Sequence, residues 1–159
     1  MLLAIDPGNV ESAWILYDNE NKMPDDFAKE INQDVSMRFE NFRTKTDTLA
    51  IEMIASYGMP VGESVFQTCV WIGRYAQLWE SLGGKAHFLF RKDVKMALCH
   101  TMKAKDSNIR QAIMDRYGST REAAIGTKKD PKACYGISKD VWAAFGVAIT
   151  FAETKHKLV

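Results

Sequence analysis

The chain opens on residues 2–9, LLAIDPGN, in which four apolar residues lead into an acid and a turn. A short apolar run that stops at Pro7 and Gly8 is typical of a buried strand followed by a tight turn. Residues 12–17, SAWILY, form a second apolar run directly behind this turn. The start of the sequence therefore predicts two strands joined by a short connection, with Asp6 at the end of the first.

The rest of the chain alternates between further strands and helices. Strands are expected at 23–29, 48–54 and 86–90, and helices at 32–43, 64–82, 92–100, 107–117 and 138–154, with a long loop at 118–135. Helix N-caps are expected at Asn32, Ser64 and Ser138. Strands that come first and then alternate with helices are typical of an α/β domain. We expect residues 1–159 to form one such domain.

The length and the composition exclude several classes of protein. With 159 residues, of which 47% are hydrophobic, the chain can bury a sizeable core in one domain. No apolar run approaches the ~20 residues that a membrane-spanning helix needs, and the first acid comes too early for a signal peptide. Three cysteines without C-x-x-C spacing argue against a disulfide scaffold and a zinc ribbon. We therefore expect a protein of the reducing cytoplasm that has no membrane partner.

The net charge of +1 conceals two halves of opposite sign. Residues 1–80 hold 6 Lys and Arg against 13 Asp and Glu, whereas residues 81–159 hold 15 against 7. Such a split indicates either a segment that faces a polyanion or two solvated faces of opposite charge. Charge alone does not separate these two interpretations.

Three acidic residues occupy positions where packing alone would not place them. Asp6 ends an apolar strand, Glu52 lies inside another, and Asp140 falls in the first turn of an apolar helix. A carboxylate in a dry environment must be paired, protonated or bound to a cation, because burial of a bare charge costs several kcal/mol. Each residue alone also has a simple structural explanation, in a turn, on a solvated strand face or at a helix dipole. Together the three suggest a shared site.

The order of these motifs resembles that of the RuvC-type Holliday junction resolvases, which belong to the ribonuclease H-like superfamily. Residues 3–8 (LAIDPG) resemble the family's opening, and residues 50–52 (AIE) resemble its second acidic motif. Residues 94–95 and the basic stretch after them are similar to its DNA-contacting region, and residues 136–144 (GISKDVWAA) to its closing helix. The segment 104–112 (AKDSNIRQA) looks closest to the phage-encoded branch.

The resemblance implies a mixed central sheet flanked by helices and a metal-dependent endonuclease that cleaves Holliday junctions and other branched DNA. Asp6, Glu52 and Asp140 would converge at one edge of the sheet as catalytic residues and metal ligands. Carboxylate oxygens suit Mg²⁺, for which Mn²⁺ is expected to substitute. Two ions in the DNA-bound state would clamp the scissile phosphodiester. Such an enzyme would work in a bacterial cell or in a phage-infected host.

The sequence departs from the family at one position. The family typically has a fourth acid one turn before the last Asp, and the residue at that place here is Ile137. The fourth acid is therefore missing or is supplied from elsewhere, for example by Asp130.

Basic residues of the second half are the candidates for DNA contact. Lysines with few aromatic residues between them suit contacts to phosphates rather than to bases. An aromatic ring in the loop behind Glu52 would stack on an unpaired base at a branch point. We expect this of Tyr57, whereas we expect Phe66 to pack in the core. The candidates for phosphate contact are Lys92, Lys95, Lys103, Lys105, Arg110, Lys128 and Lys129.

The helix expected at 64–82 is apolar on more than one face. A helix that is apolar nearly all round is either buried or meets a partner. A two-fold homodimer also suits a substrate with two symmetric cleavage points, and we expect the protein to be a homodimer.

Other functions remain open. A non-catalytic protein that binds branched DNA on the same fold is supported by the missing acid, and a ribonuclease H that acts on RNA–DNA hybrids differs only in its substrate. A sugar-kinase or actin-like ATPase also opens with a strand that ends in Asp-x-Gly. That architecture needs two such domains, for which 159 residues are too few.

Overall fold

Strand β1 (Leu2–Asp6) lies at the centre of a five-stranded sheet with the order β3-β2-β1-β4-β5. The computed structural model describes residues 1–154. The other strands are β2 (Glu11–Asp18), β3 (Met23–Ile31), β4 (Thr48–Met53) and β5 (Lys85–Phe90). β2 runs antiparallel to both β1 and β3, whereas β4 is parallel to β1 and β5 is parallel to β4. The sheet is therefore mixed, as predicted.

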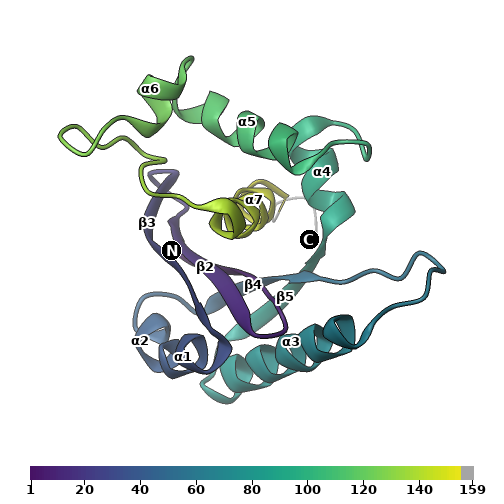
Figure 1. The fold of residues 1–159 in the computed structure, drawn as a ribbon. Coiled ribbons are helices and arrows are strands. Elements are labelled where there is room, and N and C mark those ends of the chain that lie inside the picture. The colour runs from purple at the N-terminus through teal and green to yellow at the C-terminus, as the bar shows by residue number, and fades with distance from the viewer. Residues whose placement is uncertain (155–159) are drawn as a thin grey trace.

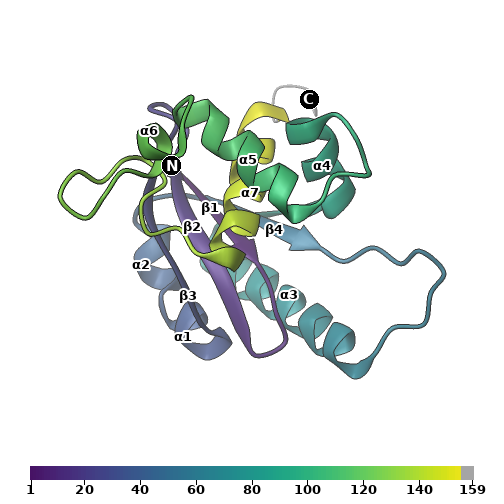
Figure 2. The ribbon, with the colours of Figure 1, turned by 45° about the horizontal axis from the view of Figure 1, so that its top comes forward.

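Helices cover both faces of the sheet (Figure 1). One face carries α1 (Asn32–Met37), α2 (Phe39–Arg43) and α3 (Glu63–Ser81). The other carries α7 (Lys139–Thr154), and α4 (Arg91–Cys99), α5 (Asp106–Tyr117) and α6 (Arg121–Ile125) lie beyond it. Figure 2 shows α7 between the sheet and α5. None of the helices within residues 1–154 is long and apolar enough to cross a membrane.

The alternation of side chains along β1 divides the interior into two cores. Leu2 and Ala4 belong to the core on the α7 face, and Leu3 and Ile5 to the core on the α3 face. All four side chains are fully buried. A strand that is buried on both faces must be apolar at every position, which explains the uninterrupted run at the start of the sequence.

Helix α7 is buried on almost every side because it is sandwiched between the sheet and the outer helices. A Cβ at Gly146 would lie 3.1 Å from a methyl carbon of Val94 in α4. The missing side chain at Gly146 therefore lets α4 pack closely against α7. The first turn of α7, which contains Asp140, is thereby held over one edge of the sheet.

Several local predictions were wrong. The helix expected at 32–43 is divided into α1 and α2 at Arg38, whose guanidinium binds Glu30 of β3 at 2.5 and 2.7 Å. Neither Asn32 nor Ser64 is an N-cap, because each already lies within the first turn of its helix. The loop expected at 118–135 contains α6, and its N-cap Thr120 accepts a hydrogen bond from the Ala123 amide.

Candidate active site

Asp6 and Glu52 come side by side because β1 and β4 are neighbouring parallel strands. Ile5 is paired in register with Ile51, one position before the two acids. Side chains alternate between the faces of a strand, and Ala50, two positions before Glu52, belongs to the core under α7. Both carboxylates therefore lie on the α7 face, at the carboxyl ends of their strands.

A buried polar network fixes the turn that follows Asp6. The Asn32 amide donates a hydrogen bond to the Gly8 carbonyl over 2.9 Å and accepts one from the Ser12 hydroxyl over 2.6 Å. The Tyr75 hydroxyl of α3 donates to the same Asn32 oxygen over 3.0 Å. Gly8 fits here because a Cβ would lie 2.3 Å from a backbone carbonyl oxygen of β2. The end of β1, and with it Asp6, is thus anchored to α1 and α3.

Asp140 reaches the same edge of the sheet from the first turn of α7. One of its oxygens lies 2.7 Å from the Lys29 ammonium of β3, which also lies 3.2 Å from Glu11. These hydrogen bonds to the two carboxylates raise the pKa of Lys29. Asp140 is therefore already paired with a cation, although nearly half of its side chain is exposed.

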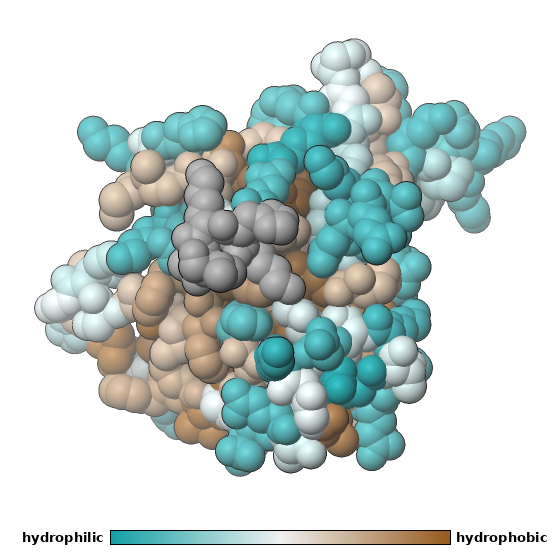
Figure 3. Space-filling view, turned by 180° about the vertical axis from the view of Figure 1, so that it is seen from behind, coloured by the Kyte–Doolittle hydropathy of each residue, from teal (hydrophilic) through white to brown (hydrophobic). Residues whose placement is uncertain are grey.

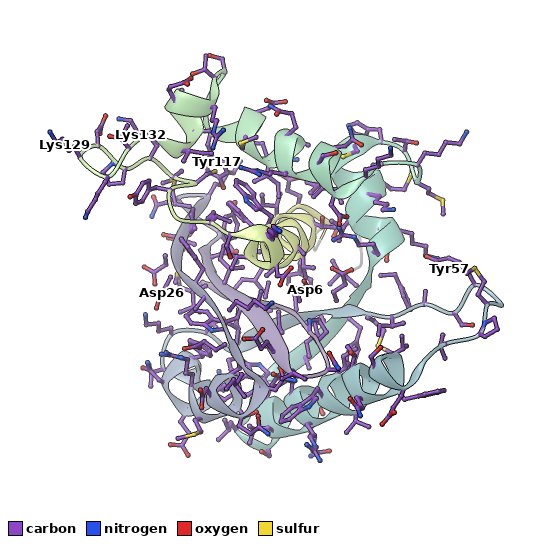
Figure 4. All side chains as sticks on the ribbon, in the orientation of Figure 1. Asp6, Asp26, Tyr57, Tyr117, Lys129 and Lys132 are labelled. Atoms are coloured by element: carbon purple, nitrogen blue, oxygen red, sulfur yellow. The ribbon has the colours of Figure 1, made fainter. Side chains whose placement is uncertain are left out.

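The three carboxylates line one cleft of about 790 Å³. Figure 4 shows Asp6 just below α7. Arg91, Asp106 and Arg110 line the same cleft. The three predicted acids thus line one cleft, together with two charged side chains that the sequence did not single out, Arg91 and Asp106.

The Asp6 carboxyl has the most strongly perturbed titration among these acids. Burial raises its pKa, and the nearby negative charge of Glu52 raises it further, to about 8. The positive charge of Arg91 opposes this shift. No side chain within residues 1–154 forms a hydrogen bond or an ion pair with this carboxylate. Asp6 is an acid without a partner, in a place where a bound cation would stabilise its charge.

Glu52 has such a partner in Arg91. One guanidinium nitrogen lies 3.4 Å from Glu52, and the other binds Asp106. Burial raises the pKa of Glu52, and Arg91 lowers it in opposition. Burial disfavours the charge of Arg91, but Glu52 and Asp106 outweigh it and raise the Arg91 pKa. Arg91 therefore joins an acid of β4 to an acid of α5.

Comparisons with known proteins identify the fold. No protein-family model matches the sequence, and no curated protein matches it. A solved structure of Thermus thermophilus RuvC matches at a TM-score of 0.69, covers 98% of this chain and 95% of that chain, and shares 13% identity. A second, T. thermophilus RuvC in complex with Holliday junction substrate, matches at 0.71 with 98% and 94% coverage and 14% identity. The fold is that of RuvC. The predicted ribonuclease H-like fold class is thereby confirmed.

The donor set of this cleft fits a hard divalent cation, although the side chains are not gathered around one. Three carboxylates from three separate elements are the ligand type that Mg²⁺ and Mn²⁺ take. Within the described part of the chain, no group of three or more His, Cys, Asp or Glu lies close enough to hold a metal ion. Glu52 is instead paired with Arg91, and Asp140 with Lys29. A bound ion would compete with these two cations for the carboxylates.

Most of the predicted phosphate-contact residues lie outside the cleft. Arg110 lines the cleft, with its guanidinium 5.2 Å from the centre of the Trp142 ring. Lys95 is close enough to Glu52 to lower the pKa of that acid. The others are exposed on α4, on the connection between α4 and α5 and on the loop behind α6: Lys92, Lys103, Lys105, Lys128 and Lys129.

Tyr57 is 68% exposed in the long loop that follows β4. Figure 4 shows Tyr57 and Lys129 on opposite sides of Asp6. A contact surface that includes both would therefore extend across the cleft.

The structure corrects the expectation for Phe66 and shows where Ile137 and Asp130 lie relative to the cleft. Phe66, expected in the core, is 61% exposed, because the buried stripe of α3 runs along another side of the helix. Ile137 packs in the core on the α7 face and does not line the cleft. Asp130 is paired with Lys132 in the loop behind α6 and does not line the cleft either.

The sequence did not point to Arg91, Asp106 or Lys29 as residues of this site. Arg91 is the first residue after β5, and Glu52 is in register with Leu89 of that strand. A basic residue directly behind the strand next to Glu52 is the signal that would have found it. The pairing of Asp140 with Lys29 depends on a contact between α7 and the edge strand, for which the sequence has no local sign.

Proposed function

We propose that this chain is a metal-dependent endonuclease that resolves Holliday junctions and other branched DNA by hydrolysing phosphodiester bonds. The observation that carries the proposal is the placement of Asp6, Glu52 and Asp140, from three elements, around one cleft of a RuvC-like fold. The matching RuvC structure that holds a Holliday junction substrate supports branched DNA as the substrate class. The phage-encoded branch, and the cytoplasm of a bacterial cell or phage-infected host, remain the proposed origin and compartment.

The three carboxylates are the proposed metal ligands and catalytic residues. Bound Mg²⁺ or Mn²⁺ would supply an activated water and charge stabilisation at the leaving oxygen. In the free protein, Arg91 and Lys29 compete for Glu52 and Asp140. We therefore expect at most one well-held ion before DNA binds, and a second in the DNA-bound state.

The test is cleavage of matched four-way, three-way, flap, linear duplex and RNA–DNA hybrid substrates with Mg²⁺ and with Mn²⁺. We expect paired nicks in the four-way junction, and activity at a lower concentration of Mn²⁺ than of Mg²⁺, since Mn²⁺ generally binds such sites more tightly. Cleavage restricted to the hybrid would identify a ribonuclease H instead.

A non-catalytic protein that binds branched DNA is the second candidate. It is favoured by the ion pairs that already occupy Glu52 and Asp140, and by the buried isoleucine at the place of a fourth acid. Tight binding of the four-way junction without any nick in either metal would establish this function.

Binding of DNA is expected to be electrostatic. Each neutralised phosphate releases counterions, so affinity falls with salt by a log–log slope of ~0.9 per contact. Replacing Lys95 and Lys105 by alanine is expected to lower this slope by about two and to weaken all DNA forms alike. The measurement is fluorescence anisotropy over a salt series. The matched control is Lys45→Ala/Lys85→Ala, because Lys45 precedes β4 and Lys85 begins β5, at the ends of these strands away from Glu52 and Arg91. An equal loss in both pairs would contradict the assignment.

The proposed homodimer uses the exposed apolar side of α3. Phe66 and Val70 lie there, both more than half exposed, and Figure 3 shows an apolar area low on the rear face, on the side of α3. We expect light scattering to report a dimer of the 18.0 kDa chain and Phe66→Asp/Val70→Asp to report a monomer. Met102→Asp, an exposed methionine between α4 and α5, should leave the dimer intact. A wild-type monomer at micromolar concentration would contradict the proposal.

A further inference from the structure

Arg91 occupies a position that the proposed chemistry does not yet explain. Its side chain is only 26% exposed and lines the carboxylate cleft, with the guanidinium against Glu52. It also borders a second, smaller hollow that contains Asp6, Glu52 and Tyr57. Arg91 therefore lies between the cleft and the loop of Tyr57, where a strand of DNA that contacts both would have to pass.

The two carboxylate partners of Arg91 can be replaced by a DNA phosphate. Its Glu52 partner is a proposed metal ligand, at 3.4 Å, and its Asp106 partner is 87% exposed. An arginine fork matches a phosphate with two parallel hydrogen bonds, and such charge-assisted pairs are among the strongest polar contacts. A DNA phosphate in the cleft would offer Arg91 a better partner than a carboxylate that a metal ion also attracts.

We propose that Arg91 is a phosphate-binding residue of the reacting site that blocks Glu52 in the free protein and releases it when a DNA phosphate arrives. The inference rests on the proposed nuclease function and deepens it. With Arg91 on Glu52, the positive charge weakens metal binding at that carboxylate. With Arg91 on the phosphate, Glu52 is free to hold an ion. The site is thereby completed only when substrate is present.

The proposal predicts effects of opposite sign for one substitution. In the absence of DNA, Arg91→Gln should bind Mn²⁺ about tenfold more tightly than wild type by isothermal titration calorimetry, because a like charge at ion-pair distance has been removed. In EDTA, the same variant should bind a four-way junction about tenfold more weakly, because a phosphate contact is lost. Cleavage should fall by about 10²-fold or more.

Two further variants separate this role from a structural one. Arg116→Ala removes another partly exposed arginine, which pairs with Glu153 at the far side of α5, and should change neither Mn²⁺ nor junction binding. Arg91→Lys keeps the charge without the fork, so Mn²⁺ binding should stay as weak as in wild type while junction binding falls. Thermal unfolding of each variant checks that the fold is retained.

The outcomes that overturn the proposal are distinct. Unchanged or weaker Mn²⁺ binding in Arg91→Gln would show that Arg91 does not block Glu52, and unchanged junction binding would show that it does not contact phosphate. Asp106→Asn should leave Mn²⁺ affinity within about twofold, and a tenfold loss would make Asp106 a ligand and Arg91 its counter-ion. A wild-type protein that cuts no DNA would refute the nuclease function, whereas the two binding measurements would still decide the role of Arg91.

Discussion

Asp6→Asn is expected to abolish cleavage and to make the protein more stable at neutral pH. The folded protein disfavours the charged form of this carboxyl, whose pKa is raised from 3.8 to about 8. A neutral, isosteric amide removes that cost together with a metal ligand. A complete shift of this size would correspond to several kcal/mol, and because Asp6 is only partly shielded from water we expect a gain of about 2 kcal/mol near pH 8. Chemical denaturation in EDTA measures it.

The gain in stability of Asp6→Asn over the wild type is expected to increase with pH. An acid whose pKa is higher in the folded than in the unfolded state binds its proton more tightly when folded, so the wild type loses stability as the pH rises from about 4 to about 8. Asp6→Asn does not share that loss. The two unfolding free energies should therefore meet below about pH 4 and separate above it. Curves that run parallel from pH 4 to pH 8 would show that the Asp6 pKa is not raised.

Melting with Mn²⁺ and binding of the junction are the control measurements for Asp6→Asn. Mn²⁺ should raise the melting temperature of the wild type and not that of Asp6→Asn, because only a charged Asp6 binds the ion. Junction binding in EDTA should be nearly unchanged, since the basic residues are untouched. Glu52→Gln and Asp140→Asn should lose cleavage in the same way, and a Glu52→Gln protein that still cuts would remove this site assignment.

The fold was predictable because its signals are local. The apolar run of β1 and the acid at its end are visible in the sequence, and the parallel pairing of β1 with β4 places Asp6 beside Glu52. Asp140 likewise falls in the first turn of a helix that is visible as an apolar stretch in the sequence. Strand and helix periodicity indicates the element that carries each acid, whereas the convergence of the three acids at one edge of the sheet was expected from the family resemblance.

The ion pairs of Glu52 and Asp140 were not predictable in this way. The partners of Glu52 and Asp140 come from β5–α4 and from β3, and only the folded structure brings Arg91 and Lys29 to them. Asn32 was expected to cap a helix, yet its side chain is used by the turn behind Asp6. Periodicity tells which side of an element is buried, but it does not tell which polar group a side chain will meet.

The exposure of Phe66 on α3 was not predicted from the sequence either. A large ring on an apolar helix is most often part of the core. The sequence showed that the helix is apolar on more than one face, but it did not show which of these faces is buried. The structure assigns the core side of α3 to Ile72, Tyr75 and Trp79, which leaves Phe66 outside. The helix is apolar on a second side because of such residues, and that second side is the one that the proposed dimer would bury.

Ile137→Asp is expected to destabilise the protein strongly rather than to restore a fourth acid. Ile137 is 9% exposed and packs in the core on the α7 face. The substitution removes an apolar side chain and buries a carboxylate without a partner, which costs about 3 kcal/mol. For a chain of this length the melting temperature should fall by about 6–12 °C. Differential scanning calorimetry measures the loss.

The position of Ile137 also decides what the variant does to metal dependence. Because Ile137 does not line the cleft that holds the three acids, a carboxylate there cannot join them without unfolding part of the core. The Mg²⁺ concentration needed for cleavage should therefore not fall. Ile137→Val, which should cost about 1 kcal/mol, controls for the lost packing, and Ser138→Asp places a charge on the neighbouring exposed residue. An Ile137→Asp protein that keeps its melting temperature and cuts at lower Mg²⁺ would show that this residue faces the metal site, and that the missing acid can be restored there.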